Sequence, residues 1–422
     1  MTNDSKSFDL SSGQQEAADK VKGWYEEADE LRDHAAEKPI FRLFGYAGTG
    51  KTTTIRAIIS QLGLTLGADV LFGAYTGKAA MVMRRQGLPA ATIHSLIYKV
   101  VDPDRKACSE LYKKLNEESN EGERNRIRQE LQIKSKPSFQ LRLPEETPLE
   151  DASLLVLDEC SMVNSDMLKD LLTFEVPLLV LGDPGQLPPI EGESPLTSVS
   201  PDVMLTEIHR QAEGNPIIAY ATRARQNIPL PFGEMGTSRN IMKSMLSRDD
   251  ILSFDQILCG KNNTRKAINT EVRQLKGFTS PYPLAGEKLI CLRNSTENGL
   301  FNGMICYVDR VGDLLDSSLE LFIRRETDDE NATPIRVLAL RAHFDSYHDK
   351  DALDRVKWWE RTDADEFDFG YGITVHKSQG SQWDNVCLID DKMFKGWGGP
   401  QDRKRWLYTG ITRAVDRICV AS

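Results

Sequence analysis

Residues 45–52, GYAGTGKT, fit the pattern G-x-x-x-x-G-K-[ST] in full. Glycines in such a loop let backbone N–H groups turn toward phosphate oxygens, and the helix that follows adds its positive end. Lys51 would reach the β- and γ-phosphates, and Thr52 would ligate Mg²⁺. The sequence therefore predicts a nucleotide site with Mg²⁺, and its phosphate-binding residues are Gly45, Ala47, Gly48, Thr49, Gly50, Lys51, Thr52 and Thr53.

Two acidic residues and an amide follow this loop along the chain. Asp158 and Glu159 end the apolar run LLVLDE, and Gln186 lies in GDPGQLPP after the next apolar run. Hydrolysis of a nucleotide needs one carboxylate at the Mg²⁺ and a second that orients water. We assign Asp158 to the metal, Glu159 to the water and Gln186 to sensing the γ-phosphate. The alternative for GDPGQLPP is a tight turn in which only the glycines and prolines matter.

Strand-like and helical stretches alternate around these residues. Residues 11–36 resemble an amphipathic helix, and PIFRLF before the loop resembles a strand. The plan of strand, loop and helix recurs in ADVLFGAYTGKAAMVMRRQG and in DQILCGKNNTRKAINTEVRQL. This alternation predicts an α/β fold with parallel sheets, whose chemistry lies at the carboxyl ends of the strands.

Two stretches interrupt the alternation. Residues 101–150 are charged and helix-forming, with a strand-like PSFQLRLP, and predict an inserted subdomain; a solvated helical excursion explains them equally well. Residues 286–343 contain several short β runs, such as KLICLR and IRVLAL, and predict a small β-barrel insert.

The composition excludes some classes of protein and leaves others open. The net charge is −10, but residues 1–37 and 345–368 carry the excess acids, and residues 392–417 hold 7 bases against 2 acids. A local basic face can bind phosphates whatever the total charge. The seven cysteines are dispersed without C-x-x-C pairs, which favours reduced core thiols. We find no apolar run of membrane-spanning length and no signal-peptide core, so we expect a cytoplasmic protein.

The set of motifs, in its order, resembles the superfamily 1 helicases, and within them the RecD-like branch and the compact phage enzymes of the Dda type. The motifs are GYAGTGKTT, AYTGKAA, TIHSL, LVLDECSM, GDPGQLPP, LTEIHRQ, YGITVHKSQGSQWDNV and LYTGITRA. The resemblance implies two RecA-like parallel-sheet motor domains, the first with a helical and β-hairpin insert and the second with an SH3-like β-barrel insert. The implied bounds are 1–100 and 151–205 for the first motor domain, 101–150 for its strand-separating insert, 206–285 and 366–422 for the second motor domain, and 286–365 for its insert.

The resemblance also assigns residues around ATP. Gln14 matches the glutamine that reads the adenine, although its neighbour Gln15 is an alternative. Arg210 in LTEIHRQ and Arg413 in YTGITRA match two arginines that approach the γ-phosphate from either side of the cleft. Two guanidinium groups can neutralise the charge that develops during phosphoryl transfer.

Further matched positions are those that contact single-stranded DNA in this family. Tyr75 stands where the family often has Pro, and it either stacks on a base or packs beneath the loop. Phe139 is a candidate for the residue that separates the strands. Gly380 would turn the chain back toward the phosphates. The implied DNA contacts are Thr76, Lys78, Thr92, His94, Thr374, His376 and Lys377.

The expected function is therefore that of an ATP-dependent DNA helicase, which moves 5′ to 3′ on single-stranded DNA and unwinds duplexes. One alternative is a DNA-stimulated translocase that strips proteins or acts in recombination without unwinding alone. Another is a switch in which ATP only sets a conformation, although Glu159 and two arginines form a hydrolytic set that a switch does not need. We expect a monomer that binds single-stranded and forked DNA, with a single-strand-binding protein or replication and recombination proteins as partners, and no membrane.

Overall fold

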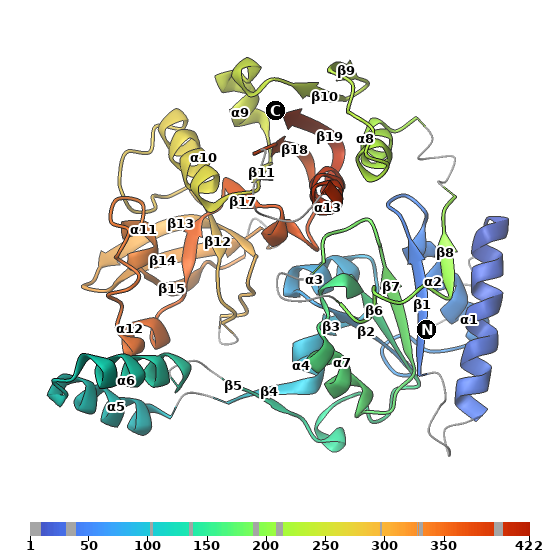
Figure 1. Ribbon diagram of the computed structural model, residues 1–422, viewed down its shortest axis with the longest axis horizontal. Coiled ribbons are helices and arrows are strands. Elements are labelled where there is room, and N and C mark those ends of the chain that lie inside the picture. Colours follow the sequence, from blue (N-terminus) through green and yellow to red (C-terminus); the bar gives the residue numbers. More distant parts are fainter. Residues whose placement is uncertain are drawn as a thin grey trace. The chain divides into compact units, whose positions relative to one another are not determined.

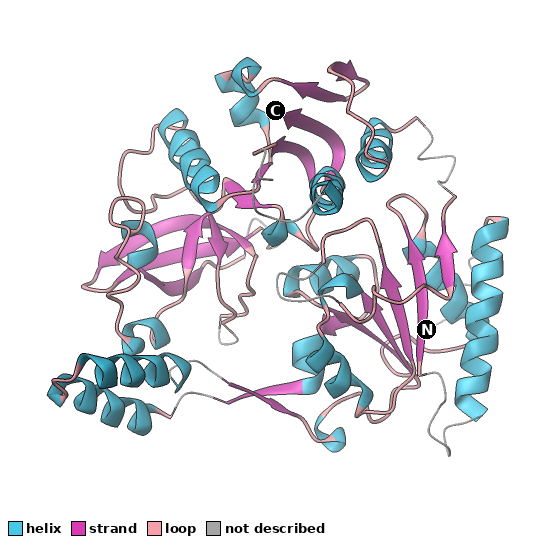
Figure 2. Cartoon of the chain, viewed as in Figure 1, coloured by secondary structure: helices cyan, strands magenta, loops and turns pink. Residues whose placement is uncertain are grey.

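The computed structural model describes residues 10–30, 39–101, 104–134, 138–188, 194–207, 214–295, 298–326, 328, 332–391 and 400–422. Helices and strands alternate through most of this chain (Figure 2). The chain divides into two compact units. The first unit comprises Met1–Ile97, Leu143–Ile268 and Gly372–Ser422, and the second comprises Tyr98–Arg142 and Asn269–Tyr371.

The first unit contains a six-stranded parallel sheet in the order β3-β2-β6-β7-β1-β8 (Figure 1). Its strands are β1 (Ile40–Gly45), β2 (Val70–Ala74), β3 (Ala90–Thr92), β6 (Leu154–Asp158), β7 (Leu178–Gly182) and β8 (Val203–Leu205). The strands β6, β7 and β1 are neighbours, and their carboxyl ends therefore meet at one edge of the sheet. The segments that follow them are the phosphate loop, the pair Asp158–Glu159 and the turn that contains Gln186, so the topology brings the predicted nucleotide residues together.

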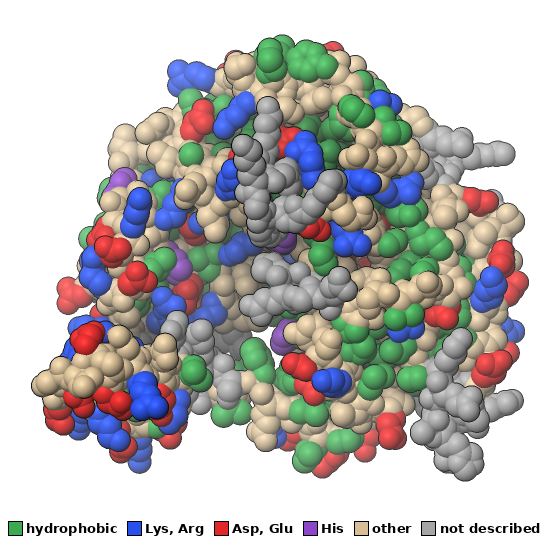
Figure 3. Space-filling model, viewed as in Figure 1, with side chains coloured by type: hydrophobic (Ala, Val, Ile, Leu, Met, Phe, Trp, Pro, Cys, Tyr) green, Lys and Arg blue, Asp and Glu red, His purple; other side chains and the backbone are tan. Residues whose placement is uncertain are grey.

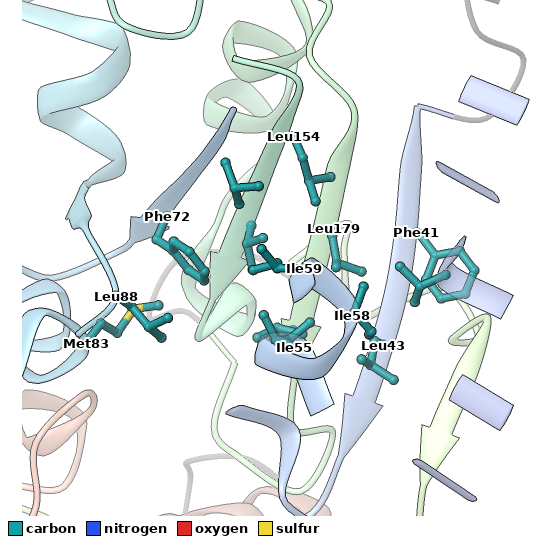
Figure 4. Packing of buried hydrophobic residues seen from close by; sticks show 14 of the residues in the cluster. Phe41, Leu43, Ile55, Ile58, Ile59, Phe72, Met83, Leu88, Leu154 and Leu179 are labelled. Atoms are coloured by element: carbon teal, nitrogen blue, oxygen red, sulfur yellow. The ribbon is translucent and has the colours of Figure 1, made fainter. Parts of the chain in front are cut away.

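Helices cover this sheet through their apolar faces. They are α1 (Ser12–Glu30), α2 (Lys51–Leu62), α3 (Gly77–Arg85), α4 (Ile93–Ile97) and α7 (Ser165–Leu172). In α2, Ile55, Ile58 and Ile59 follow helical spacing and pack on Leu43 and Leu179 of the sheet (Figure 4). Full burial of an aliphatic side chain stabilises a fold by about 1.5–3 kcal/mol, so this face of α2 fixes the helix and the loop before it.

A second six-stranded sheet lies in the same unit, in the order β17-β11-β18-β19-β10-β9. It is parallel except for the edge pair β9–β10. The strands are β9 (Gly233–Met235), β10 (Ser238–Ile241), β11 (Gln256–Cys259), β17 (Gly372–Thr374), β18 (Trp383–Ile389) and β19 (Ala414–Ala421). The accompanying helices are α8 (Pro216–Arg225), α9 (Arg248–Ser253), α10 (Asn262–Leu275) and α13 (Pro400–Ile411). The helix α13 connects β18 to β19, and it packs against α8.

The second unit contains Tyr98–Arg142, which covers most of the stretch 101–150 where the sequence predicts an insert; residues 143–150 belong to the first unit. An antiparallel ribbon of β4 (Tyr98–Val101) and β5 (Ser138–Leu141) carries α5 (Arg105–Glu117) and α6 (Glu121–Lys134). The two helices share a small core of Cys108, Leu111, Leu115, Ile127 and Leu131. Acidic and basic side chains mix on the outer face of this helix pair (Figure 3). The two helices therefore pack against each other, and the strand-separating subdomain at 101–150 stays a prediction.

Phe139 lies on β5 of that ribbon. Its side chain is 51% exposed, its cross-strand partner is Val100, and its ring centroid is 6.0 Å from that of Tyr98. A large exposed aromatic residue is compatible with the predicted strand-separating role, which stays a prediction.

The second unit also contains a five-stranded antiparallel sheet in the order β15-β14-β13-β12-β16. Its elements are β12 (Lys288–Cys291), β13 (Ile305–Leu314), β14 (Ser318–Arg325), β15 (Ile335–Leu340), α11 (Ala342–Asp345), α12 (Trp358–Thr362) and β16 (Phe367–Phe369). The strand β16 falls within 366–422, the range predicted for the second motor domain, but it pairs with β12 of the insert. The SH3-like class of this insert and the domain bounds stay predictions.

The parallel first sheet and the second sheet, which is parallel except for the pair β9–β10, confirm the predicted α/β fold with two RecA-like sheets. Among the described residues, no helix is long and apolar enough to cross a membrane.

Candidate functional site

The phosphate loop lies between β1, which ends at Gly45, and α2, which begins at Lys51. Gly50 has a φ of 74°, a left-handed conformation that glycine adopts without steric cost. At Gly45, a Cβ atom would stand 2.5 Å from Oγ1 of Thr49, and that hydroxyl donates a 2.8 Å hydrogen bond to the carbonyl of Tyr46. Glycine is therefore required at both positions for the loop to turn into the helix.

A cavity of about 380 Å³ is formed by this loop, the ends of β6 and β7, and residues of the second sheet. It contains most of the predicted catalytic and metal residues. Its lining residues are Tyr46, Ala47, Gly48, Gly50, Lys51, Thr52, Thr53, Asp158, Glu159, Gly182, Asp183, Gln186, Gln382, Thr412 and Arg413. The predicted residue Thr49 is buried behind the loop, and Gly45 ends the strand beneath it.

The cavity lining carries two cationic side chains, Lys51 and Arg413, and three acidic ones, Asp158, Glu159 and Asp183. The Lys51 ammonium donates to the carbonyl oxygens of Gly45 and Tyr46, at 2.6 and 3.3 Å. The backbone N–H of Glu159 donates to Oδ1 of Asp158 at 2.8 Å. Burial, and then the negative charge of Glu159, raises the pKa of Asp158 to about 6. Carboxylates in this environment favour a nearby divalent cation, and Thr52 offers a hydroxyl oxygen in the same cavity.

Gln186 and Arg413 approach this cavity from different sheets. Oε1 of Gln186 is buried and has no hydrogen-bond partner among the described residues. An orphan acceptor of this kind is explained by a water or a polar ligand in the cavity. Arg413, which is 3% exposed, donates to the carbonyls of Thr409 and Ser381 and to the hydroxyl of Thr412, at 3.0, 3.3 and 3.2 Å. Arg210 lies outside the described residues.

Gln14 lies behind the phosphate loop. Its amide donates to the carbonyl of Thr49 at 3.3 Å, and its Oε1 accepts from the N–H of Ser11 at 3.1 Å. Gln14 also lines a second cavity of about 300 Å³, which extends to Glu207. Gln15 instead bonds Asp19 on the exposed side of α1. The geometry therefore places Gln14, and not Gln15, beside the nucleotide loop.

The DNA-contact residues predicted on the first sheet lie at two loops. Thr76 caps α3, because its hydroxyl accepts from the N–H of Ala79 at 3.1 Å. Thr92 Oγ1 donates to Oγ of Ser95 at 2.9 Å, at the start of α4. Tyr75 meets His94 edge-on with ring centroids 5.8 Å apart, which favours packing over base stacking.

Lys78 has a different environment from the one that the sequence suggests. Its side chain is only 7% exposed, and its Nζ lies 4.3 Å from the ring centroid of Trp383 on the second sheet. The charge is therefore directed at an aromatic ring, a favourable cation–π geometry. A direct contact between Lys78 and DNA phosphate stays a prediction.

The predicted residues of the second sheet follow β17. Thr374 ends that strand, and its hydroxyl accepts from the N–H of Lys377 at 3.4 Å; Lys377 is exposed. Burial lowers the pKa of His376 and of His94. Gly380 has a φ of 71°, and a Cβ there would stand 2.9 Å from Oγ1 of Thr76. Gly380 thus packs against the first-sheet loop that contains Thr76, and the nearby Gln382 lines the nucleotide cavity.

The fold also brings Tyr408, Asp183 and Thr409 to the same site, although no site role was predicted for them. The Tyr408 hydroxyl bonds both the phosphate loop and Asp183, and the Thr409 hydroxyl bonds the turn after β7. The sequence motifs could have indicated these three residues. Tyr408 and Thr409 precede Arg413 in LYTGITRA, and Asp183 precedes Gln186 in GDPGQ.

Two known families match parts of the chain. The AAA domain family matches residues 28–230, and the UvrD-like helicase C-terminal domain family matches residues 369–420. Together the two matches include every segment that lines the nucleotide cavity.

Some of the curated proteins and solved structures with similar chains are helicases by name. The ATP-dependent RecD2 DNA helicase of Deinococcus radiodurans is 25% identical over 94% of this chain, which spans 49% of that protein. The chain spans about half or less of the first curated relatives that it matches. The crystal structure of Pif1 helicase from Candida albicans has a TM-score of 0.51 at 16% identity, covering 98% of this chain and 94% of that chain. A structure of two coordinating Pif1 helicases at forked double-stranded DNA has a TM-score of 0.50 at 18% identity, covering 98% and 92%. These structural similarities concern the fold.

Proposed function

Because this chain belongs to the superfamily 1 helicases of the RecD-like type, we propose that it is an ATP-dependent DNA helicase that moves 5′ to 3′ along single-stranded DNA. The observation that carries the proposal is the composition of the 380 Å³ cavity. The loop, the two carboxylates and Gln186 come from the first sheet, and Arg413 comes from the second. A site shared by two sheets can convert nucleotide chemistry into movement of one sheet against the other.

Residues of the first sheet would hold Mg²⁺. Thr52 supplies a hydroxyl oxygen, and Asp158 supplies a carboxylate whose pKa is raised by burial and by the negative charge of Glu159. Both are oxygen donors, which Mg²⁺ prefers. When bound, Mg²⁺ would neutralise charge on the β- and γ-phosphates.

The remaining residues divide the work of hydrolysis. Lys51 binds the terminal phosphates, Glu159 orients water, and Gln186 contacts the γ-phosphate. Arg413, and Arg210 as the second arginine, stabilise charge that develops in the transition state. Lys51, Gln186 and Arg413 all favour the γ-phosphate, so ATP draws the two sheets together. Hydrolysis removes this shared anchor and lets them separate.

DNA movement follows if the two DNA-gripping surfaces alternate in affinity. Thr76 and Thr92 supply hydroxyl groups on the first sheet, and Thr374 and Lys377 supply polar groups on the second. The contacts between Gly380 and Thr76 support a direct connection between these surfaces. Backbone-directed binding of this kind is salt-dependent.

Strand displacement with forked and blunt duplexes tests the proposed function. We expect ATP-dependent displacement of the forked substrate and ATP hydrolysis that single-stranded DNA stimulates. ATP hydrolysis that DNA stimulates, without strand displacement, would indicate a protein-stripping translocase instead of a helicase. ATP binding without DNA-stimulated hydrolysis would indicate a nucleotide-gated switch instead of a helicase.

We expect His376 to be uncharged at neutral pH, because burial lowers its pKa below the ordinary value of 6.5. The unfolded chain then takes up a proton near pH 6.5 that the folded chain takes up only at lower pH. The free energy of unfolding therefore falls as the pH drops through 6.5. Thermal unfolding should occur at a lower temperature at pH 5.5 than at pH 7.5, and His376→Asn should reduce that difference. An undiminished difference in the variant would show that His376 does not contribute.

A further inference from the structure

Tyr408 links the second sheet to two parts of the nucleotide site. Its side chain, on α13, is 1% exposed. Its hydroxyl accepts a 2.9 Å hydrogen bond from the N–H of Ala47 in the phosphate loop, and it donates a 2.5 Å hydrogen bond to Oδ2 of Asp183. One hydroxyl group of α13 thus holds both the loop after β1 and the turn after β7.

The next residue extends this connection to Arg413. The hydroxyl of Thr409 accepts from the N–H of Leu187 at 2.9 Å, and the carbonyl of Thr409 accepts from Nε of Arg413 at 3.0 Å. The same turn of α13 therefore holds the segment that contains Gln186 and the arginine that lines the same cavity.

The turn after β7 is shaped to accept the Tyr408 ring. A Cβ atom at Gly185 would stand 2.9 Å from Cε1 of Tyr408, so a larger residue would displace the ring. Asp183 is buried, and its Oδ1 accepts from the N–H of Gly185 at 2.9 Å. A buried carboxylate needs hydrogen-bond donors, and Tyr408 supplies one of them.

We infer that Tyr408 is a positioning residue for ATP hydrolysis, because its hydroxyl fixes α13, and with it Arg413, relative to the phosphate loop and the Gln186 turn. Tyr408 acts through these groups and contacts no phosphate itself. The inference rests on the proposed ATP hydrolysis. It predicts an effect on turnover and little effect on nucleotide binding, because the residues assigned to the phosphates are unchanged.

Tyr408→Phe keeps the ring and removes only the hydroxyl. We expect kcat for DNA-stimulated ATP hydrolysis to fall on the order of tenfold, the size expected for losing a hydrogen bond to a charged group. The KM for ATP should stay within about twofold of the wild-type value, because the residues that bind ATP in the ground state are unchanged. Tyr220→Phe is the matched control: Tyr220 is fully buried on α8, and its hydroxyl has no hydrogen-bond partner among the described residues. The control should retain wild-type kcat.

A double-mutant cycle separates positioning from general destabilisation. If Tyr408 acts through Asp183, then Tyr408→Phe should lower kcat by much less than tenfold when it is made in the Asp183→Asn variant. Gly185→Ala displaces the ring by a different route and should also lower kcat at a nearly unchanged KM, which keeps the test valid if Tyr408→Phe folds poorly. Equal kcat values for wild type and Tyr408→Phe, or full additivity in the cycle, would overturn the inference. Absence of ATP hydrolysis in the wild type would instead overturn the proposed function.

Discussion

Replacing Lys51 with Ala is expected to reduce DNA-stimulated ATP hydrolysis by about 100-fold or more, the range measured when one preorganised donor to a transition state is removed. Lys51 is the first residue of α2, and its ammonium group lies in the nucleotide cavity. This ammonium group donates hydrogen bonds to the carbonyl oxygens of Gly45 and Tyr46. Without it, the terminal phosphates lose their main cation from the first sheet. Phosphate release with saturating single-stranded DNA measures the loss.

Lys169→Ala is the matched control for this variant. Lys169 lies on α7 of the same unit, its side chain is 76% exposed, and its ammonium group pairs with the exposed carboxylate of Asp166 at 3.4 Å. Exposed pairs of this kind contribute little to stability, so the control should hydrolyse ATP as the wild type does. Hydrolysis by Lys51→Ala at the wild-type rate would show that the loop is not the ATP site.

Replacing Glu159 with Gln is expected to lower kcat by about 10²–10⁴-fold while ATP still binds, because the amide cannot accept the proton that a carboxylate accepts from water. Glu159 directly follows Asp158 at the end of β6, and it has a φ of 54°. Non-glycine residues rarely adopt this conformation, and strained backbone is frequent at catalytic positions. Phosphate release and equilibrium binding of ATP together separate loss of chemistry from loss of binding.

Glu175→Gln provides an unusually close control. Glu175 has a φ of 55° and is exposed after α7, away from the lining of the nucleotide cavity. The same exchange at the same backbone conformation should therefore leave kcat unchanged. Equal losses in the two variants would attribute the effect to backbone strain, and unchanged turnover in Glu159→Gln would remove Glu159 from the mechanism.

Local patterns explain why the sheets and the phosphate loop could be predicted from the sequence. The glycines of GYAGTGKT predict positions where a side chain does not fit or where the backbone is left-handed. In the fold, Gly45 leaves no room for a Cβ atom, and Gly50 is left-handed. Apolar runs before Asp158 and before the Gln186 turn become neighbouring strands, and parallel pairing then brings their ends together. Each of these inferences depends on residues close in sequence.

Contacts between distant residues could not be inferred in this way. Tyr408 and Ala47 are separated by 361 positions, and no periodicity in either segment indicates that they meet. Lys78 was interpreted as a DNA contact from the motif AYTGKAA, and the fold buries it against Trp383 at the start of β18. A lysine can satisfy its charge on an aromatic face as well as on a phosphate, and only the packing of the two sheets distinguishes the two environments.

The central claim, that ATP hydrolysis in this cavity drives directed movement on DNA, is tested most directly by strand displacement from duplexes that carry a single-stranded tail on one end only. We expect the wild-type chain, with ATP and Mg²⁺, to displace the strand from the 5′-tailed duplex and not from the 3′-tailed duplex. Displacement from the 3′-tailed duplex alone, or displacement from either duplex without ATP, would contradict the claim.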